Sequence, residues 1–441
     1  MYTEGRAPET AAPAAALANP QFDLPDRVFE FCRAPHDFVL RAAQTGRIVP
    51  FRLSSEIYAA TGDPDILHGI FNARPEDFDR GDFPELIDQA FGRNILTMEG
   101  AEWASLRNVM TPLFTPNRLA AMRASVQSVI AAHLEKWSSF AQTGEPFELL
   151  AATKRLAFDI VRKTFVRIED DIADDAFEAF NRMDRMEGVR IYMLARRAKG
   201  IGSSFRPSAA NAGMDRVLYA LAERRLESSH DTGDLVSSVI SDRLFQEIPA
   251  GGRREFLRQL IASIVVAGYV TTADSMFWSI HLLARHPEIQ TRLGDETGDD
   301  PSPLLRAVIN ETLRLYPSVW YLGRVARRDV MLGDVEIAAG TKIVCSPWVL
   351  HRMPNLWPEP EAFRPERFLP GASVAPRTYI PFGSGMHACL GRGLALLELN
   401  GLLTAATRRF RFEWTNNESP TFAATFSLQA RERILVRMSS R

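Results

Sequence analysis

One short segment combines residue types that bind metals with a loop that can approach another group closely. It reads Phe-Gly-Ser-Gly-Met-His-Ala-Cys-Leu-Gly over residues 382–391, and a helical run follows from Arg392 to Thr407. Glycine has no side chain, so Gly383, Gly385 and Gly391 let the backbone come close to a neighbouring object. The segment therefore predicts a tight loop that leads into a helix.

The cysteine of this loop, Cys389, stands just before the predicted helix. The N–H groups and the dipole at a helix N-terminus stabilise negative charge, so this position favours a thiolate that can bind a metal. Cys32 and Cys345 are distant in the sequence, which leaves zinc sites and iron–sulfur clusters without ligands. A metal here would take its other ligands from a macrocycle. The alternative is an ordinary buried cysteine, which the glycine pattern disfavours.

The loop resembles the cysteine loop of the cytochrome P450 family of haem-thiolate proteins, F-x-x-G-x-[HR]-x-C-x-G, at every fixed position. The resemblance implies that Cys389 is the axial ligand of the iron of haem b. It also implies that the ring of Phe382 shields the sulfur. Matches in the family's order extend from about residue 92 to residue 441, so the resemblance covers most of the chain.

Two charged motifs precede the cysteine loop. Glu311 and Arg314 lie three residues apart on a predicted helix, where a charge pair by itself usually forms a surface salt bridge. Arg367 follows in the sequence Pro-Glu-Arg-Phe, residues 365–368. Their order and type match the family's E-x-x-R and P-E-R-F elements. The resemblance implies that Glu311, Arg314 and Arg367 form a buried ion network with a structural role.

Another set of residues resembles the family's partners for the haem propionates. Trp103 and Arg107 match the motif W-x-x-x-R and lie one helical turn apart on one face. Two propionates need cationic or donor partners once they are partly removed from water. The resemblance assigns Trp103, Arg107, Arg324 and His387 to this role. For Arg324 the alternative is an exposed arginine on a strand.

The most apolar stretch, residues 260–270, predicts a buried helix that is too short to span a bilayer. Its end resembles the family's A-G-x-[DE]-T-[TS] motif, in which the acid and the threonine relay protons during dioxygen activation. Ala267 and Gly268 match, and the Thr271 hydroxyl can bond to the carbonyl of Ala267 and bend the helix. These three residues are the predicted catalytic residues. Val270 replaces the acid.

The missing acid leaves the reaction open. Hydroxylation, phenol coupling, desaturation and ring formation all remain, as does a reaction with peroxide or a nitrogen oxide. By resemblance, the substrate pocket is lined by residues 83–96, 183–205, 267, 271, 319–322 and 422–426. Their aromatic and methionine content predicts an apolar or aromatic organic substrate.

Four basic residues within the predicted lining allow a second interpretation of the substrate. These cations can anchor a carboxylate or a carrier-bound substrate, or simply form a solvated face, which is the commoner case. They are Arg190, Arg196, Arg197 and Lys199.

The resemblance as a whole implies a stand-alone monooxygenase. It would receive NAD(P)H-derived electrons from a separate ferredoxin or flavodoxin, activate dioxygen, and oxidise a small organic molecule in natural-product tailoring or catabolism. The alternatives are a haem sensor or electron carrier without turnover, and a helical scaffold with a coincidental cysteine loop.

The elements that must position these residues are mostly helical. Apolar residues recur at three- and four-residue spacing in segments between residues 84 and 290. Alternating segments predict strands near both ends of the chain and hairpins around residues 333–334 and 339–340. The fold prediction is a mainly α single domain over residues 21–441, with one small sheet built partly from N- and C-terminal strands. Residues 1–20 predict a mobile tail.

The composition limits the remaining classes. The chain has 441 residues, 46% of them hydrophobic and 24% charged, and a net charge of −2. This balance provides no concentrated basic surface for nucleic acid. Three scattered cysteines exclude a disulfide framework and favour a reducing, cytoplasmic setting. The N-terminus has no apolar core and predicts neither a signal peptide nor a membrane anchor.

Overall fold

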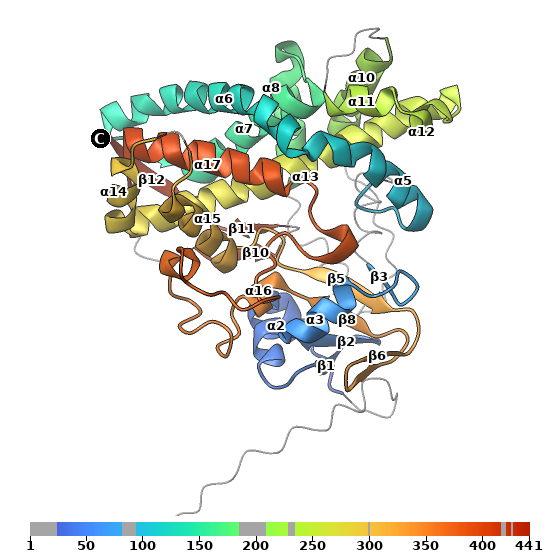
Figure 1. The fold of residues 1–441 in the computed structure, drawn as a ribbon. Coiled ribbons are helices and arrows are strands. Elements are labelled where there is room, and N and C mark those ends of the chain that lie inside the picture. The colour runs from blue at the N-terminus through green and yellow to red at the C-terminus, as the bar shows by residue number, and fades with distance from the viewer. Residues whose placement is uncertain are drawn as a thin grey trace, which may run out of the picture.

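A layer of long helices lies over a smaller region rich in strands (Figure 1). The computed structural model describes residues 24–81, 94–184, 209–227, 234–298, 300–415, 420–424 and 427–441. The predicted tail, residues 1–20, lies outside these ranges. Helices predominate in the described part, so the expectation of a mainly α fold with small sheets is confirmed.

Helices predominate in the described part of residues 84–290, where the periodicity predicts them. The bounds of the described helices are α1 Val28–Arg33, α2 Pro35–Ala43, α3 Pro64–Phe71, α5 Gly100–Met110, α6 Pro116–Thr143, α7 Leu149–Val161, α8 Asp170–Asp184, α10 Ala209–Glu227, α11 Leu235–Ile240, α12 Arg243–Gln246, α13 Ala250–Arg285, α14 Pro287–Asp295, α15 Pro303–Leu315, α16 Pro347–Leu350 and α17 Arg392–Arg409. Short turns of other helix types are η1 Thr111–Phe114, η2 Arg162–Val166, η3 Pro365–Phe368 and η4 Gly385–His387.

Helix α13 runs through the middle of the helical layer and packs along α7. Most of its residues from Leu257 to Leu283 are buried, as expected for a helix surrounded by protein. Its length and composition alone would also allow it to cross a membrane, but most of its apolar window is buried in the protein. A Cβ at Gly268 would come within 3.0 Å of the Val161 side chain, so the glycine permits close contact between α7 and α13.

The strands of the described residues form four small sheets. Their bounds are β1 Val49–Leu53, β2 Glu56–Thr61, β3 Phe78–Asp79, β4 Phe147–Glu148, β5 Leu322–Ala326, β6 Val330–Leu332, β7 Val335–Ile337, β8 Lys342–Cys345, β9 Phe410–Trp414, β10 Phe422–Ala424, β11 Leu428–Ala430 and β12 Leu435–Ser440. One sheet has the order β1-β2-β8-β5-β3 and another the order β4-β12-β9; β6 pairs with β7 and β10 with β11.

The prediction that strands from both ends of the chain share one sheet is wrong. The N-terminal strands β1 and β2 continue into β8, which pairs with β2 in parallel. The C-terminal strands β9 and β12 pair with each other and with β4. Alternating polarity identifies a half-buried strand but carries no information about its partner, which explains the error.

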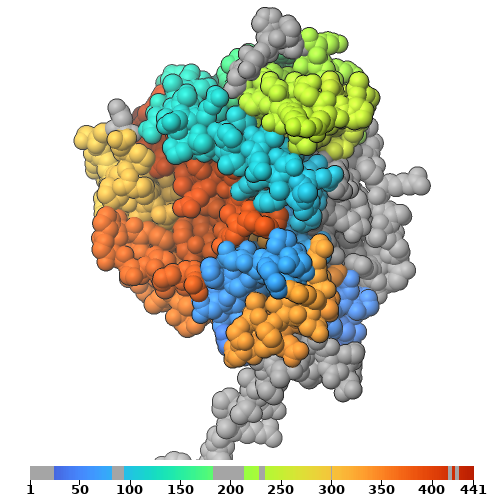
Figure 2. Space-filling view, turned by 45° about the vertical axis from the view of Figure 1, so that its right-hand side comes forward, coloured from blue at the N-terminus to red at the C-terminus, as the bar shows by residue number. Residues whose placement is uncertain are grey.

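Only one of the two predicted hairpins forms. β6 and β7 pair around Gly333, whose φ of 64° suits a tight hairpin turn. Helix α3 lies beside this hairpin, where a Cβ at Gly69 would come within 3.1 Å of Leu332 (Figure 2). After Gly340 the chain does not fold back on β7, because β8 inserts between β2 and β5. This insertion directs β5 and the loop before it towards α13.

Candidate functional site

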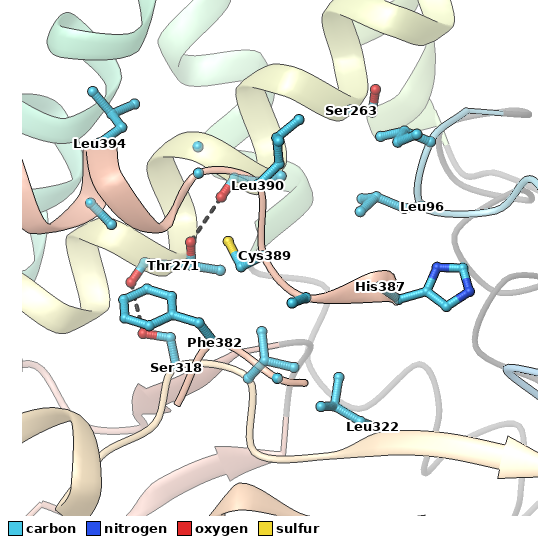
Figure 3. A pocket seen from close by; sticks show the side chains of 18 of the residues that line it. Leu96, Ser263, Thr271, Ser318, Leu322, Phe382, His387, Cys389, Leu390 and Leu394 are labelled. Atoms are coloured by element: carbon cyan, nitrogen blue, oxygen red, sulfur yellow. Dashed lines mark hydrogen bonds between the residues drawn. The ribbon is translucent and has the colours of Figure 1, made fainter. Parts of the chain in front are cut away.

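A cavity of about 310 Å³ lies where α13, the cysteine loop and the segment before β5 meet. The side chains around it come from elements that are far apart in the sequence (Figure 3). Its apolar lining is Phe71, Ile95, Leu96, Met110, Phe114, Val161, Phe165, Leu235, Ile264, Leu313, Val319, Leu322, Leu390 and Leu394. The cavity also contains every residue named above as a catalytic or cofactor-binding candidate.

The cysteine loop has the tight geometry that its glycines predict. Gly383 and Gly385 both adopt a φ of 70°, in the left-handed region that side chains disfavour. A Cβ at Gly385 would also overlap the carbonyl oxygen of Phe71, so no other residue fits there without a shift of the backbone. The N–H of Cys389 donates to the carbonyl of Phe382 over 2.9 Å and closes the loop. Together these contacts fix the cysteine at the cavity wall.

Cys389 is exposed towards the cavity, although the surrounding protein still desolvates its thiol. Helix α17 begins at Arg392, three residues later, so the predicted position before a helix is confirmed. Burial nevertheless raises the pKa of the thiol, and this effect outweighs the N–H groups of Gly391 and Arg392 and the charge of Arg107, which lower it. The N–H groups at the helix start thus act in the predicted direction, and burial opposes them.

The predicted propionate partners gather at one side of the cavity. The ring of Trp103 lies 4.3 Å from that of His387 and 5.7 Å from the guanidinium carbon of Arg107. Nη2 of Arg107 donates to the carbonyl of Ala388 over 2.8 Å, which ties α5 to the cysteine loop. Nδ1 of His387 is buried and has no hydrogen-bond partner among the described residues.

Arg324 is buried, so the alternative of an exposed strand arginine is excluded. Its Nη1 donates to the carbonyl of Gly323 over 2.7 Å. Burial lowers the pKa of Arg324, because the charged form of a guanidinium is poorly solvated in the protein interior. An anionic group in the cavity would relieve this cost.

A further cation at the cavity was missed from the sequence. Arg80 is buried after β3, and its guanidinium bonds to Glu99 over 2.5 Å and to the carbonyl of Leu96 over 2.9 Å. It also donates to the carbonyl of Met98. No motif marks this residue, because its partners, the Glu99 carboxylate and the carbonyls of Leu96 and Met98, lie on another segment. Arg80 therefore holds the Leu96 segment at the cavity wall.

Helix α13 contributes Ala267, Gly268 and Thr271 to the cavity, as predicted. Oγ1 of Thr271 donates to the carbonyl of Ala267 over 2.8 Å, so the expected bond back to the preceding turn is present (Figure 3). Val270 lies instead in the apolar core and does not line the cavity. The residue that replaces the acid thus faces protein.

The charged motifs behind the cavity also come together. The guanidinium of Arg314 bonds to both carboxylate oxygens of Glu311, and Nε of Arg367 lies 3.4 Å from Oε1 of Glu311. Both side chains of the Glu311–Arg314 pair are completely buried. The structure therefore contains the buried ion network that the resemblance implied.

Parts of the predicted pocket lie outside the described residues. These include the basic residues Arg190, Arg196, Arg197 and Lys199 and most of the 83–96 and 183–205 segments. Ile95, Leu96, Val319 and Leu322 are described and line the cavity. Phe422 is described but does not line it; its ring packs against Trp278, with 5.6 Å between centroids.

The side chains that line the cavity fit a haem, but they do not fit a metal site built from several protein ligands. Among the described residues, no group of three or more His, Cys, Asp and Glu side chains is placed to bind a metal. One accessible sulfur therefore faces a cavity that also contains the buried cations Arg80 and Arg324 and the unsatisfied nitrogen of His387. A single thiolate ligand, an apolar wall and cations for two carboxylates are the features of a haem-thiolate protein.

Comparisons with known proteins agree with this class. The sequence model of the cytochrome P450 family matches residues 28–436. The chain therefore belongs to the cytochrome P450 family. Its relatives in that family are monooxygenase-type oxidoreductases, and this chain is an enzyme of that type.

The relatives are distant but span most of the chain. Cyclooctat-9-en-7-ol 5-monooxygenase of Streptomyces melanosporofaciens is 29% identical over 86% of this chain and 85% of its own length. Cytochrome P450 734A4 of Oryza sativa subsp. japonica is 30% identical over 79% of this chain and 73% of its own length. The crystal structure of CYP175A1 from Thermus thermophilus is 26% identical, with a TM-score of 0.73 over 93% of this chain and 97% of that one.

Proposed function

We propose that this protein is a cytoplasmic haem b monooxygenase that oxidises a small apolar or aromatic organic molecule in natural-product tailoring or catabolism. Dioxygen would be its oxidant, and NAD(P)H-derived electrons would arrive through a ferredoxin or flavodoxin. The observation that carries the proposal is the accessible sulfur of Cys389 in an apolar cavity rimmed by buried cations.

The cofactor would be held from two sides. Cys389 would bind the iron through its sulfur, and the ring of Phe382 lines the same cavity beside it. Arg107, Arg324 and His387, together with Trp103, would bind the propionates. When bound, a haem-thiolate group activates dioxygen with two electrons and two protons and inserts one oxygen atom into the substrate.

The protein's own residues would orient the substrate and supply protons. Leu96, Ile264 and Leu322 line the cavity with apolar side chains and favour a substrate of low polarity. Gly268 lines the cavity on α13, where the lack of a side chain also admits Val161 of α7. Thr271 presents a hydroxyl at the cavity on the same helix, where it would hold a proton for delivery. We therefore assign Ala267, Gly268 and Thr271 as catalytic residues.

The relative from Streptomyces melanosporofaciens supports a cyclic, largely apolar substrate, because its name describes the oxidation of cyclooctat-9-en-7-ol. The test is a spectral titration of the purified protein against a library of cyclic terpenoid and aromatic compounds. A substrate that displaces water from the iron changes the spin state and the Soret band. We expect responses from apolar cyclic compounds. A complete lack of response, with haem fully loaded, would contradict this substrate class.

The ligand assignment has its own test. The reduced, carbon-monoxide-bound protein should show the strongly red-shifted Soret band of thiolate ligation, and Cys389→Ser should lack it. Cys345→Ser is the matched control, since Cys345 is a buried cysteine in β8 that does not line the cavity. If Cys389→Ser keeps the band, the assignment is wrong.

Val270 favours a second candidate reaction. A chain without the relay acid can instead use peroxide or a nitrogen oxide, which need fewer delivered protons. Turnover with added hydrogen peroxide, in the absence of NAD(P)H and redox partner, separates the two. A peroxide-driven rate above the NAD(P)H-driven rate would favour the second reaction. A haem sensor would bind ligands without forming product under either condition.

A further inference from the structure

Ser318 joins the loop after α15 to helix α13 at Thr271. Its hydroxyl lies 2.8 Å from the carbonyl oxygen of Thr271 (Figure 3) and 2.8 Å from the hydroxyl of Ser275. The hydroxyl of Ser275 also lies 3.0 Å from the Thr271 carbonyl. Ser318 and Ser275 are both buried and both line the cavity.

The protons in this triangle limit its hydrogen bonds. Each serine hydroxyl has one proton, so two of the three contacts can be hydrogen bonds at a time. Ser318 donates to the Thr271 carbonyl while Ser275 donates either to Ser318 or to the same carbonyl, or Ser318 donates to Ser275, which then donates to the carbonyl. In every arrangement Ser318 is linked to α13, directly or through Ser275.

The other hydroxyl bonds near this point stay within α13. The hydroxyls of Thr271 and Ser279 each donate to the carbonyl four residues earlier, and such bonds bend a helix. They cannot fix the helix relative to its neighbours. Ser318 can, because it belongs to the loop that continues through Val319 and Leu322, which line the cavity, to Arg324.

We propose that Ser318 is a positioning residue that holds the Thr271 turn of α13 in register with the loop between α15 and β5 and with Arg324. This inference rests on the proposed proton-donor function of Thr271. The loop positions the cofactor's proposed anchor and the helix positions the proposed donor, so their link sets the distance between the two. A displacement of about 1 Å at a reacting group can lower a rate by a factor of about 100.

The experiment compares holoenzyme variants with the same redox partner and one substrate found in the titration. Ser318→Ala removes the link, and Ser318→Thr restores a hydroxyl. Ser279→Ala is the matched control, since it removes a buried hydroxyl that bonds only within α13 and does not line the cavity. The readouts are the C–O stretching frequency of the reduced carbon monoxide complex, the product formed per NAD(P)H, and the melting temperature.

We expect Ser318→Ala to shift the C–O stretch and to lower product per NAD(P)H about threefold to tenfold, the effect of one lost hydrogen bond. Ser318→Thr should restore most of both. Ser318→Cys keeps the shape of the side chain, weakens the hydrogen bond and gives the same test if the alanine variant does not fold.

Three results would overturn the inference. One is an unchanged C–O stretch and coupling in Ser318→Ala while Thr271→Ala loses coupling, which leaves the function of Thr271 intact. Another is an equal change in Ser279→Ala, which would show a general effect of removing a hydroxyl from α13. The third is an unchanged yield of product per NAD(P)H in Thr271→Ala. That result would show that Thr271 is not the proton donor, so its contact with Ser318 would have no catalytic purpose.

Discussion

Glu311 and Arg314 form a doubly hydrogen-bonded ion pair from which solvent is completely excluded. Nε and Nη2 of the arginine lie 2.7 and 2.8 Å from the two carboxylate oxygens, and neither side chain has exposed area. The same carboxylate accepts the backbone N–H of Arg364 over 2.9 Å. Arg314 also donates to the carbonyls of His351 and Pro360. One ion pair thus connects α15 to the chain segment that precedes the cysteine loop.

Glu311→Ala should leave Arg314 charged, buried and without a carboxylate. Such a change typically costs about 3–5 kcal/mol, a large part of the stability of a domain. We expect little folded holoprotein and a strongly lowered melting temperature. Glu30→Ala is the control, because Arg27 and Glu30 form a pair of the same spacing on the surface, worth about 0–1 kcal/mol. Similar yields and melting temperatures in both variants would show that the network is not stabilising.

Arg324 should govern how tightly the haem is retained. Arg324→Leu removes the buried cation proposed for a propionate, and a hydrogen bond to a charged group is worth about 1.5–3 kcal/mol. We therefore expect haem loss to an acceptor apoprotein to be about 10- to 100-fold faster. Arg327→Leu, a change at a half-exposed arginine in the same region, is the control. Equal rates in both variants would remove Arg324 from the propionate site.

Glu398 is a fully buried carboxyl on α17 that has no hydrogen-bond partner among the described residues. Burial raises its pKa well above the ordinary value. The unfolded chain loses this proton near its ordinary pKa of 4.5, whereas the folded protein keeps it. Between the two pKa values, stability therefore falls as the pH rises, by up to about 1.4 kcal/mol per pH unit.

Glu398→Gln should abolish this dependence and stabilise the protein more at pH 8 than at pH 5. Denaturant unfolding at both pH values measures the effect, and Glu413→Gln, at an exposed carboxylate on β9, is the control. If Glu398→Gln is no more stabilising at pH 8 than at pH 5, the carboxyl has a charged partner in the folded protein.

The sequence identified the residues of the site, but it did not identify the residues that contact and position them. The Cys389 loop and the Trp103–Arg107 pair depend on local spacing, which a motif records. Arg80 contacts Glu99 and backbone carbonyls of another segment, and Ser318 contacts side-chain and backbone groups of α13. No local pattern encodes such contacts. The misplaced terminal strands have the same cause, because a strand's own pattern does not name its partner.

Val270 shows the same limit within one motif. The position in the sequence identified it as the replacement for an acid, but only the packing shows that its side chain faces the apolar core and not the cavity. The consequence for the reaction therefore depends on what the neighbouring Thr271 can do alone.

Thr271→Ala should divert electrons from product to hydrogen peroxide. Without an acid at position 270, the Thr271 hydroxyl is the proposed proton donor of α13, and a positioned acid or base contributes a factor of about 10²–10⁴. Product per NAD(P)H should fall at least about tenfold, and released peroxide should rise correspondingly. Thr271→Ser keeps the hydroxyl and should retain coupling. Val270→Asp, which places a carboxylate in the apolar core, should lower the melting temperature and should not rescue Thr271→Ala in the double variant. Unchanged coupling in Thr271→Ala would instead assign proton delivery to the substrate or to ordered water.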